Sequence, residues 1–258
     1  MLDLTAGNVG LMLLAAGGAG VVDAIVGGGG LIMVPALFGL FPQALPATLL
    51  GTNKAAAVWG TAWSAWQYAR RVKLPSRRLM GATAAALIGS ALGAWLATKV
   101  PASSFRVALP LVLGAVWVYT LWRKDLGHTH EPSWAPHVEA WWATLLGATV
   151  GLYDGLFGPG TGSFFVFALV RGLGWDFLHA SAAAKRLNVA TNVAALAWFI
   201  PHGHVVWALA LPMALANVLG STIGTRLALR HGAGFVRIAF LVVVGVLILK
   251  TAWDAWGG

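Results

Sequence analysis

The most constraining feature of this chain is a motif that occurs twice, 131 residues apart, within apolar sequence. The copies share an aspartate, a glycine-rich break and a lysine: Asp23, 27–30 and Lys54 in the first, Asp154, 158–162 and Lys185 in the second. Self-similarity at a fixed period indicates two structural units of the same kind. Two halves of this type, each with a glycine break and a lysine in an apolar stretch, are typical of a transporter with one site between its repeats.

Composition places both halves in a membrane. Hydrophobic residues make up 59% of the 258 residues and charged residues 10%, whereas a soluble domain carries about 25% charged residues. Apolar runs recur along the whole chain, so we predict a multi-pass protein. The run 7–26 lacks a basic n-region and an A-x-A cleavage site, and we interpret it as a retained span. The absence of cysteine excludes disulfides, thiol catalysis and Cys-ligated metal.

Each half divides into five apolar segments. They are 5–26, 31–41, 45–69, 79–99 and 104–122 in the first half, and 139–157, 163–173, 177–200, 205–229 and 234–253 in the second. The second segment of each half is too short for an upright span of about 20 residues. We therefore expect broken helices at the glycine motifs, which survive in a membrane only where they are buried or line a cavity. The predicted fold is an all-α polytopic membrane protein with an N-terminal repeat (1–122), a polar loop (123–138) and a C-terminal repeat (139–258).

Positive charge predicts how the halves are oriented. The loop after the third segment of the first half holds five basic residues, whereas its counterpart at 201–204 holds no Lys or Arg. By the positive-inside rule the first loop is cytoplasmic and its counterpart is external. We therefore predict an inverted 5+5 arrangement. Lys99 and Arg106, which this arrangement places outside, favour the alternative of a parallel 4+4 arrangement with re-entrant short segments.

The remaining polar features have simpler interpretations. The net charge of +9 reflects basic residues at span ends, and no nucleic-acid motif accompanies it. We interpret the loop with His128, His130 and Glu131 as a solvated linker and predict no metal site there. The Gly-x-x-x-Gly pairs, Gly89/Gly93 and Gly220/Gly224, indicate close helix contact.

The glycine breaks predict an anion site. A helix that begins at Leu31 or Ser163 presents free backbone N–H groups and the positive end of its dipole, and glycine lets a ligand approach the backbone closely. Such a cradle binds an anion without a charged side chain, although close packing of small residues is the alternative. Its residues are Gly28, Gly29, Gly30 and Leu31 in the first repeat and Gly160, Thr161, Gly162 and Ser163 in the second.

Lys54 and Lys185 lie deep inside long apolar segments, where an ionisable residue is by default a functional hypothesis. We predict that both contact the anion. The alternatives are ion pairs with Asp23 or Asp154, or lysines that extend to the surface. The aspartates would then hold the lysines in the empty state or carry protons.

Asparagines accompany the lysines. Asn53 precedes Lys54, and Asn188 and Asn192 follow Lys185 on one helical face. Their amides are donors suited to oxyanion oxygens, and hydrogen bonding between helices is the alternative explanation.

These motifs resemble a known family. The stretch 27–37 with 51–54 closely resembles the first repeat of the sulfite exporter TauE/SafE family, also called the toluene sulfonate uptake permease family, and 153–163 with 184–192 is similar to its second repeat. The resemblance covers nearly the whole chain. It implies a bacterial inner-membrane permease for sulfur-containing anions such as sulfite, thiosulfate, sulfoacetate or aryl sulfonates. Arg186 stands where the family implies a smaller or apolar residue.

We therefore expect a secondary transporter, not an enzyme, that needs no cofactor and binds its anion between the repeats as a monomer or homodimer. The alternative is a cation- or proton-coupled carrier for another small organic anion such as a carboxylate. A cation carrier built on Asp23 and Asp154 is disfavoured by the duplicated lysines. A hydrolase that uses Ser163 and His179 is disfavoured because the counterpart of Ser163 is Ile32.

Overall fold

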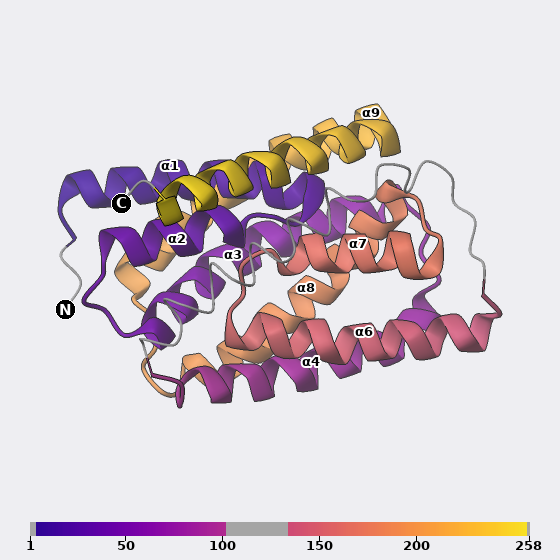
Figure 1. The fold of residues 1–258 in the computed structure, drawn as a ribbon, viewed down its shortest axis with the longest axis horizontal. Helices are drawn as coiled ribbons and strands as arrows, with labels where there is room; N and C mark the ends of the chain where they lie inside the picture. Colours follow the sequence, from indigo (N-terminus) through magenta and orange to yellow (C-terminus); the bar gives the residue numbers. More distant parts are fainter. Residues whose placement is uncertain (1–3, 102–133, 257–258) are drawn as a thin grey trace.

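The computed structural model describes residues 4–101 and 134–256, and every regular element in them is a helix (Figure 1). The helices are α1 (Ala6–Val26), α2 (Gly30–Leu40), α3 (Pro46–Ala69), α4 (Ser76–Ala97), α6 (Pro136–Leu156), α7 (Thr161–Leu173), α8 (Phe177–Phe199) and α9 (Trp207–Trp256). The predicted all-α class is confirmed. The segment 104–122, Arg106 and the polar residues of the linker at 128–131 lie outside the described residues.

Local sequence explains where several helices begin. The Thr5 side chain accepts a hydrogen bond from the Asn8 N–H at the start of α1, and Asp176 caps the first turn of α8. Pro46 occupies the first turn of α3, where its missing N–H has no helical partner to lose. The predicted separation between 205–229 and 234–253 appears as Gly232, whose φ of 73° interrupts α9.

Helices from the two halves of the chain pack on each other reciprocally. Helix α1 packs on the first part of α9, and α6 packs on α4, the counterpart of that part of α9. A Cβ atom built on each glycine of the Gly-x-x-x-Gly pairs would lie 2.0–2.5 Å from a backbone oxygen of the facing helix. The four contacts are Gly220 with Gly17, Gly224 with Val21, Gly89 with Ala148 and Gly93 with Leu152. The last two contacts join the positions that are equivalent, at an offset of 131 residues, to those joined by the first two. The predicted close helix contacts are confirmed.

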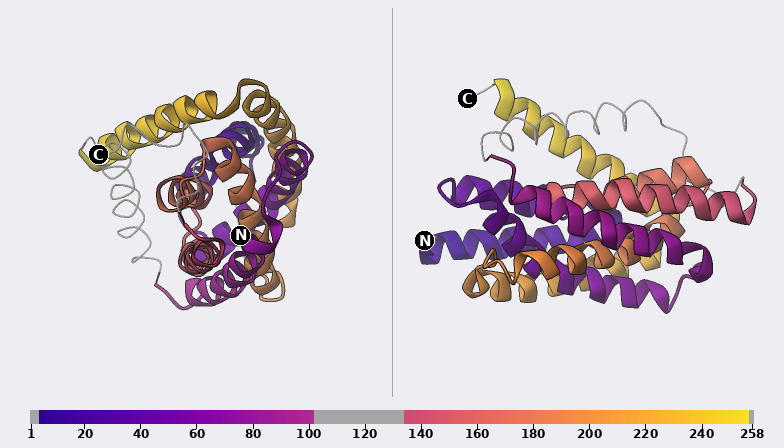
Figure 2. Two further views of the ribbon diagram at one scale, coloured as in Figure 1. Left: turned by 90° about the vertical axis from the view of Figure 1, so that its right-hand side faces the viewer. Right: turned by 90° about the horizontal axis from the view of Figure 1, so that it is seen from below.

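Equivalent helices differ in direction. In Figure 1, α1 and α6 run in opposite directions, and so do α3 and α8. The two views of Figure 2 show the helices of both repeats gathered into one bundle.

Three helical stretches among the described residues have the length and composition of membrane spans: Ala6–Val26, Leu79–Ala97 and Trp207–Gly232. Helices α3, α6 and α8 are of similar length, 21 to 24 residues, but they carry the lysines, Asp154 and the asparagines. The short helices α2 and α7 have 11 and 13 residues and bury several apolar side chains, among them Met33 and Leu37 in α2 and Phe165 and Leu169 in α7. The backbone breaks therefore lie inside protein, as a membrane requires.

Candidate functional site

The two glycine breaks contact each other directly. Helix α1 ends at Val26 and is capped by Gly27, whose φ is 81°. Helix α7 begins after Gly160, whose φ is 77°. A Cβ atom built on Gly27 would lie 2.2 Å from the carbonyl carbon of Gly162. The close approach of the two backbones therefore requires glycine on both sides of the contact.

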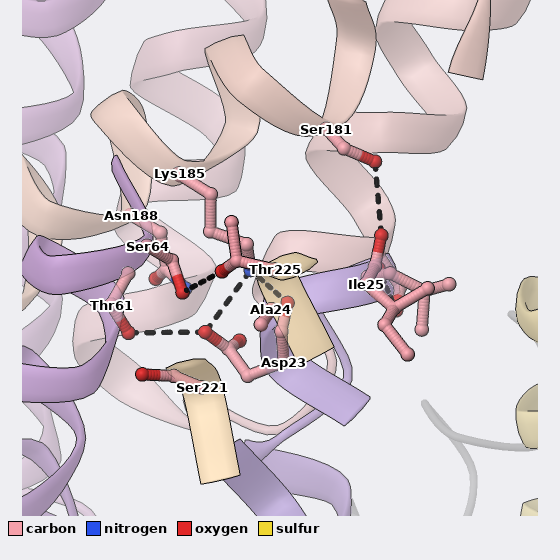
Figure 3. A network of polar contacts seen from close by, with 12 residues as sticks. Asp23, Ala24, Ile25, Thr61, Ser64, Ser181, Lys185, Asn188, Ser221 and Thr225 are labelled. Atoms are coloured by element: carbon pink, nitrogen blue, oxygen red, sulfur yellow. Dashed lines mark hydrogen bonds and ion pairs between the residues drawn. The ribbon is translucent and has the colours of Figure 1, made fainter. Parts of the chain in front are cut away.

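The buried end of α1 is held by hydrogen bonds from other elements. The last carbonyl groups of a helix have no partner within it, so a buried helix end needs other donors. Four consecutive carbonyl oxygens have such donors: Ala24 accepts from the Tyr68 hydroxyl (3.0 Å), Ile25 from the Ser181 hydroxyl (3.2 Å), Val26 from the Ser163 hydroxyl (3.0 Å) and Gly27 from the Ser163 N–H (3.1 Å). Figure 3 shows the bond between Ser181 and Ile25. The first break is therefore tied to α3, α7 and α8.

Each lysine forms an ion pair with the aspartate of the other repeat. Lys54 Nζ lies 2.7 Å from Asp154 Oδ2, and Lys185 Nζ lies 3.0 Å from Asp23 Oδ2. All four side chains are buried, so neither lysine extends to the surface. The ion pairs that the sequence left as an alternative are therefore present, and they cross between the repeats.

The two ion pairs have different surroundings. Lys185 Nζ also donates to the Asp23 carbonyl oxygen, and the Thr61 hydroxyl donates to Asp23 Oδ2 at 3.1 Å (Figure 3). Lys54 Nζ instead has Asn192 Oδ1 at 3.4 Å as its second partner. Thr61 and Asn192 are 131 residues apart and so occupy equivalent positions. In one ion pair this position supplies a donor to the aspartate, and in the other it supplies an acceptor to the lysine.

A small polar cavity lies between the breaks. It leaves about 20 Å³ for the centres of water molecules, which is room for about one water. Lys54 lines this cavity, whereas Lys185 does not and is fully buried. Of the two lysines, only Lys54 can therefore reach a ligand in this conformation.

The cavity brings together ten of the fifteen residues that the sequence pointed to. They are Asp23, Gly29, Gly30, Asn53, Lys54, Asp154, Thr161, Gly162, Asn188 and Asn192. The other five, Gly28, Leu31, Gly160, Ser163 and Lys185, do not line it.

Hydrogen bonding explains several of these placements. The Leu31 N–H donates to the Gly28 oxygen, and the Ser163 N–H and hydroxyl are both engaged by α1. In contrast, the N–H groups of Gly30 and Gly162 form no hydrogen bond within the described residues, and both residues line the cavity. Fewer backbone N–H groups are therefore free to bind an anion than the sequence predicts.

The cavity also contains polar groups without partners. The Oδ1 atom of Asn53 is buried and has no hydrogen-bond partner among the described residues. The Nδ2 groups of Asn53, Asn188 and Asn192 donate to no protein group in that part of the chain either. Since buried polar groups are almost always paired, these amides are placed to bind water or a ligand.

Six further lining residues are not among the predicted ligands, although the first two belong to the predicted glycine breaks: Gly27, Gly158, Met33, Ala57, Thr61 and Asn217. Thr61 could have been selected from the sequence, because it occupies the position equivalent to Asn192. Asn217 had only its polarity within an apolar span, and its amide donates to the Ala16 oxygen at 3.0 Å. Arg186 lies away from the cavity, in a groove with Lys73 between α3 and α8.

Comparison with known proteins matches residues 12–251 to the family described as "Sulfite exporter TauE/SafE". The "Probable membrane transporter protein ORF9" of Sinorhizobium sp. is 38% identical over 98% of this chain and 96% of its own length. The "Probable membrane transporter protein YfcA" of Escherichia coli K12 is 35% identical over 93% of this chain and 87% of its own length. A "Probable membrane transporter protein" of Haemophilus influenzae is 30% identical over 92% and 91% of the two chains. No solved structure matches the chain significantly.

The family and the spans agree on the class of protein. The match covers both repeats and both breaks, and the relatives are membrane transporters by name. The expected class, a multi-pass membrane transporter and not an enzyme, is confirmed. The chain belongs to the sulfite exporter TauE/SafE family.

Proposed function

We propose that the protein is a secondary transporter that carries a small sulfur-containing anion, such as sulfite, thiosulfate or a small organosulfonate, across the bacterial inner membrane. The observation that carries this proposal is the placement of Lys54. It is a buried cation that faces a cavity lined by amides and free backbone N–H groups, at the junction of two repeats. The amide NH2, backbone N–H and ammonium groups are donors, and together they match the oxygens of a sulfur oxyanion.

The net charge of the site supports coupling to protons. Two lysines and two aspartates make the buried site neutral as it stands. An anion that enters must therefore replace a carboxylate as the partner of Lys54, because an unpaired buried charge is costly. Protonation of Asp154 releases Lys54 for the anion, so one proton binds together with one negative charge.

The two lysines have separate roles in this scheme. Lys54 binds the anion, and Asp154 carries the proton. Lys185 instead fixes the end of α1, because it holds both the carboxylate and the carbonyl oxygen of Asp23.

We further propose that the repeats are inverted, in the 5+5 arrangement. The opposite directions of α1 and α6 support this, as does the reciprocal packing of α1 on α9 and α6 on α4 (Figure 1). Movement of one repeat against the other would open the cavity to each side in turn. The observed cavity, with room for about one water, belongs to the closed state between these openings.

The experiment is thermal unfolding of the purified protein with sulfite, thiosulfate, sulfoacetate, toluenesulfonate, sulfate, lactate or sodium. A ligand that binds the folded state raises the melting temperature by mass action. We expect a rise with a sulfur anion that is lost in Lys54→Ala and kept in Lys73→Ala, which removes an exposed lysine outside the cavity. A rise with lactate alone would favour the carboxylate carrier, and a rise with sodium alone would refute anion binding.

Lys185→Ala separates the two roles. We expect it to lower the melting temperature without ligand, because it leaves Asp23 buried and unpaired, at a cost of about 3–5 kcal/mol. Lys185→Met in an Asp23→Leu background should recover much of that stability and still respond to the anion. If the restored double variant no longer bound the anion, Lys185 would be a ligand and the assignment of roles would be wrong.

A further inference from the structure

A second basic site lies at the end of the bundle where α3 meets α9. Four arginines line one pocket of about 540 Å³: Arg70 and Arg71 after the end of α3, and Arg226 and Arg230 from α9. Trp66 and Gln67 of α3 also line this pocket. The sequence predicts a cytoplasmic position for the loop that holds Arg70 and Arg71, and the fold brings Arg226 and Arg230 into the same pocket.

The positive charge of this pocket has no protein counter-charge within residues 4–101 and 134–232. The structure describes four acidic side chains in these ranges. Asp23 and Asp154 pair with the buried lysines, Glu139 accepts from Trp175, and Asp176 contacts His179. None of them reaches an arginine of the pocket, so in this part of the chain four guanidinium groups share one hollow without a carboxylate.

The other polar group of the wall is also a donor. The Nε2 atom of Gln67 is buried and has no hydrogen-bond partner among the described residues. A buried amide without a partner costs free energy unless water or a ligand satisfies it. The pocket therefore presents guanidinium and amide N–H groups to one space, and it needs an acceptor with several oxygens.

The surroundings of the pocket are those of a membrane surface. Trp63 and Trp66 stack with their ring centroids 4.9 Å apart, and both are partly exposed on α3. The Arg70 guanidinium lies 4.9 Å from the centroid of the Trp66 ring. Tryptophans of this kind mark the headgroup level of a bilayer, so the arginines next to them lie at the depth of lipid phosphates.

We propose that this pocket binds a phosphate group, supplied by the headgroup of an anionic phospholipid. Arginine matches phosphate oxygens with two parallel N–H donors, and basic pockets between helices on the cytoplasmic side bind lipid headgroups in this way. The site is separate from the central cavity and shares no lining residue with it. A bound headgroup would join the end of α3 to α9 just before the interruption at Gly232.

The test is thermal unfolding in nanodiscs of phosphatidylcholine alone and of phosphatidylcholine mixed equally with phosphatidylglycerol. We expect phosphatidylglycerol to raise the melting temperature of the wild-type protein, and the double variant Arg226→Gln/Arg230→Gln to lose that rise. The matched control, Arg77→Gln/Arg171→Gln, removes two exposed arginines outside the pocket and should keep it. A second measurement is mass spectrometry of the lipid that stays bound after delipidation. The wild-type protein and the control variant should retain phosphatidylglycerol, and the pocket variant should lose it.

Three results would overturn the proposal. An equal loss in the control variant would mean that phosphatidylglycerol acts through general surface charge and not through this pocket. A full rise with inorganic phosphate in phosphatidylcholine nanodiscs, lost in the pocket variant, would assign the pocket to a soluble phosphate and refute the lipid source. No rise with either would refute phosphate binding altogether.

Discussion

Replacement of Gly27 by alanine tests whether the two breaks meet backbone to backbone. Two effects act at this position. A residue other than glycine at φ 81° costs about 1–2 kcal/mol, and the new Cβ would lie 2.2 Å from the carbonyl carbon of Gly162. Overpacking of this kind costs about 1–3 kcal/mol. We therefore expect Gly27→Ala to lose roughly 2–5 kcal/mol.

Two other glycines separate these effects. Gly203 has a φ of 73° and nothing within 4 Å of a built Cβ, so Gly203→Ala carries the backbone cost without the clash. Gly18 lies in α1 with open space around it, so Gly18→Ala should be neutral or slightly stabilising. The difference between Gly27→Ala and Gly203→Ala isolates the contact between the breaks.

The assay is thermal unfolding in detergent together with uptake of the anion into liposomes. For a chain of this size, 1–3 kcal/mol corresponds to about 2–12 °C in melting temperature. Gly27→Ala should melt lower than Gly203→Ala by this margin and should transport more slowly, because the repeats can no longer close on each other. Equal melting temperatures for the two variants would refute the contact.

Two smaller perturbations test other parts of the fold. Tyr68→Phe removes the donor to the Ala24 carbonyl oxygen and should cost about 1–3 kcal/mol of stability, measured as a lower melting temperature. In the loop before α9, burial and the neighbouring His202 lower the pKa of His204 below its usual value of 6.5. The unfolded chain then binds the proton more readily, so the stability should fall as the pH drops through about 6.5. This fall in melting temperature should be smaller in His204→Gln. An equal dependence of melting temperature on pH in the two proteins would contradict the prediction.

Much of the fold could be predicted from the sequence because hydrophobic length and glycine breaks act locally. The predicted segments 45–69 and 177–200 match α3 (Pro46–Ala69) and α8 (Phe177–Phe199) closely. The sequence predicts a segment that starts at 139, whereas α6 begins three residues earlier, at Pro136. In the structure Glu139 is buried and accepts a hydrogen bond from Trp175 at 2.8 Å. A partner so far along the chain is not visible to a local pattern.

The candidate site could be predicted only as a set of residues. The repeat singled out the lysines and aspartates but did not reveal that each pair crosses to the other repeat, since the contacts join residues 100 and 162 positions apart. Nor did symmetry reveal which lysine faces the cavity. That difference arises from side chains that the repeat does not duplicate.

These unduplicated side chains indicate which break moves. The donors that hold the end of α1 are Tyr68, Ser163 and Ser181, and their counterparts 131 residues away are Phe199, Ile32 and Leu50. The second break therefore cannot be held in the same way, because three apolar side chains stand where the hydroxyl donors would be.

The second break has side-chain hydrogen bonds from its own repeat instead. The Tyr153 hydroxyl donates to the Pro159 oxygen at 2.6 Å, and the Thr161 hydroxyl donates to the Gly158 oxygen at 2.9 Å. The Lys54–Asp154 ion pair connects the second break to the other repeat. Protonation of Asp154 would weaken this ion pair. We therefore expect amide hydrogen exchange to be faster at 156–162 than at 24–30, and to rise further in Asp154→Asn only at the second break. Equal protection of the two breaks would mean that both move together, and that the unequal hydrogen bonding has no part in opening the cavity.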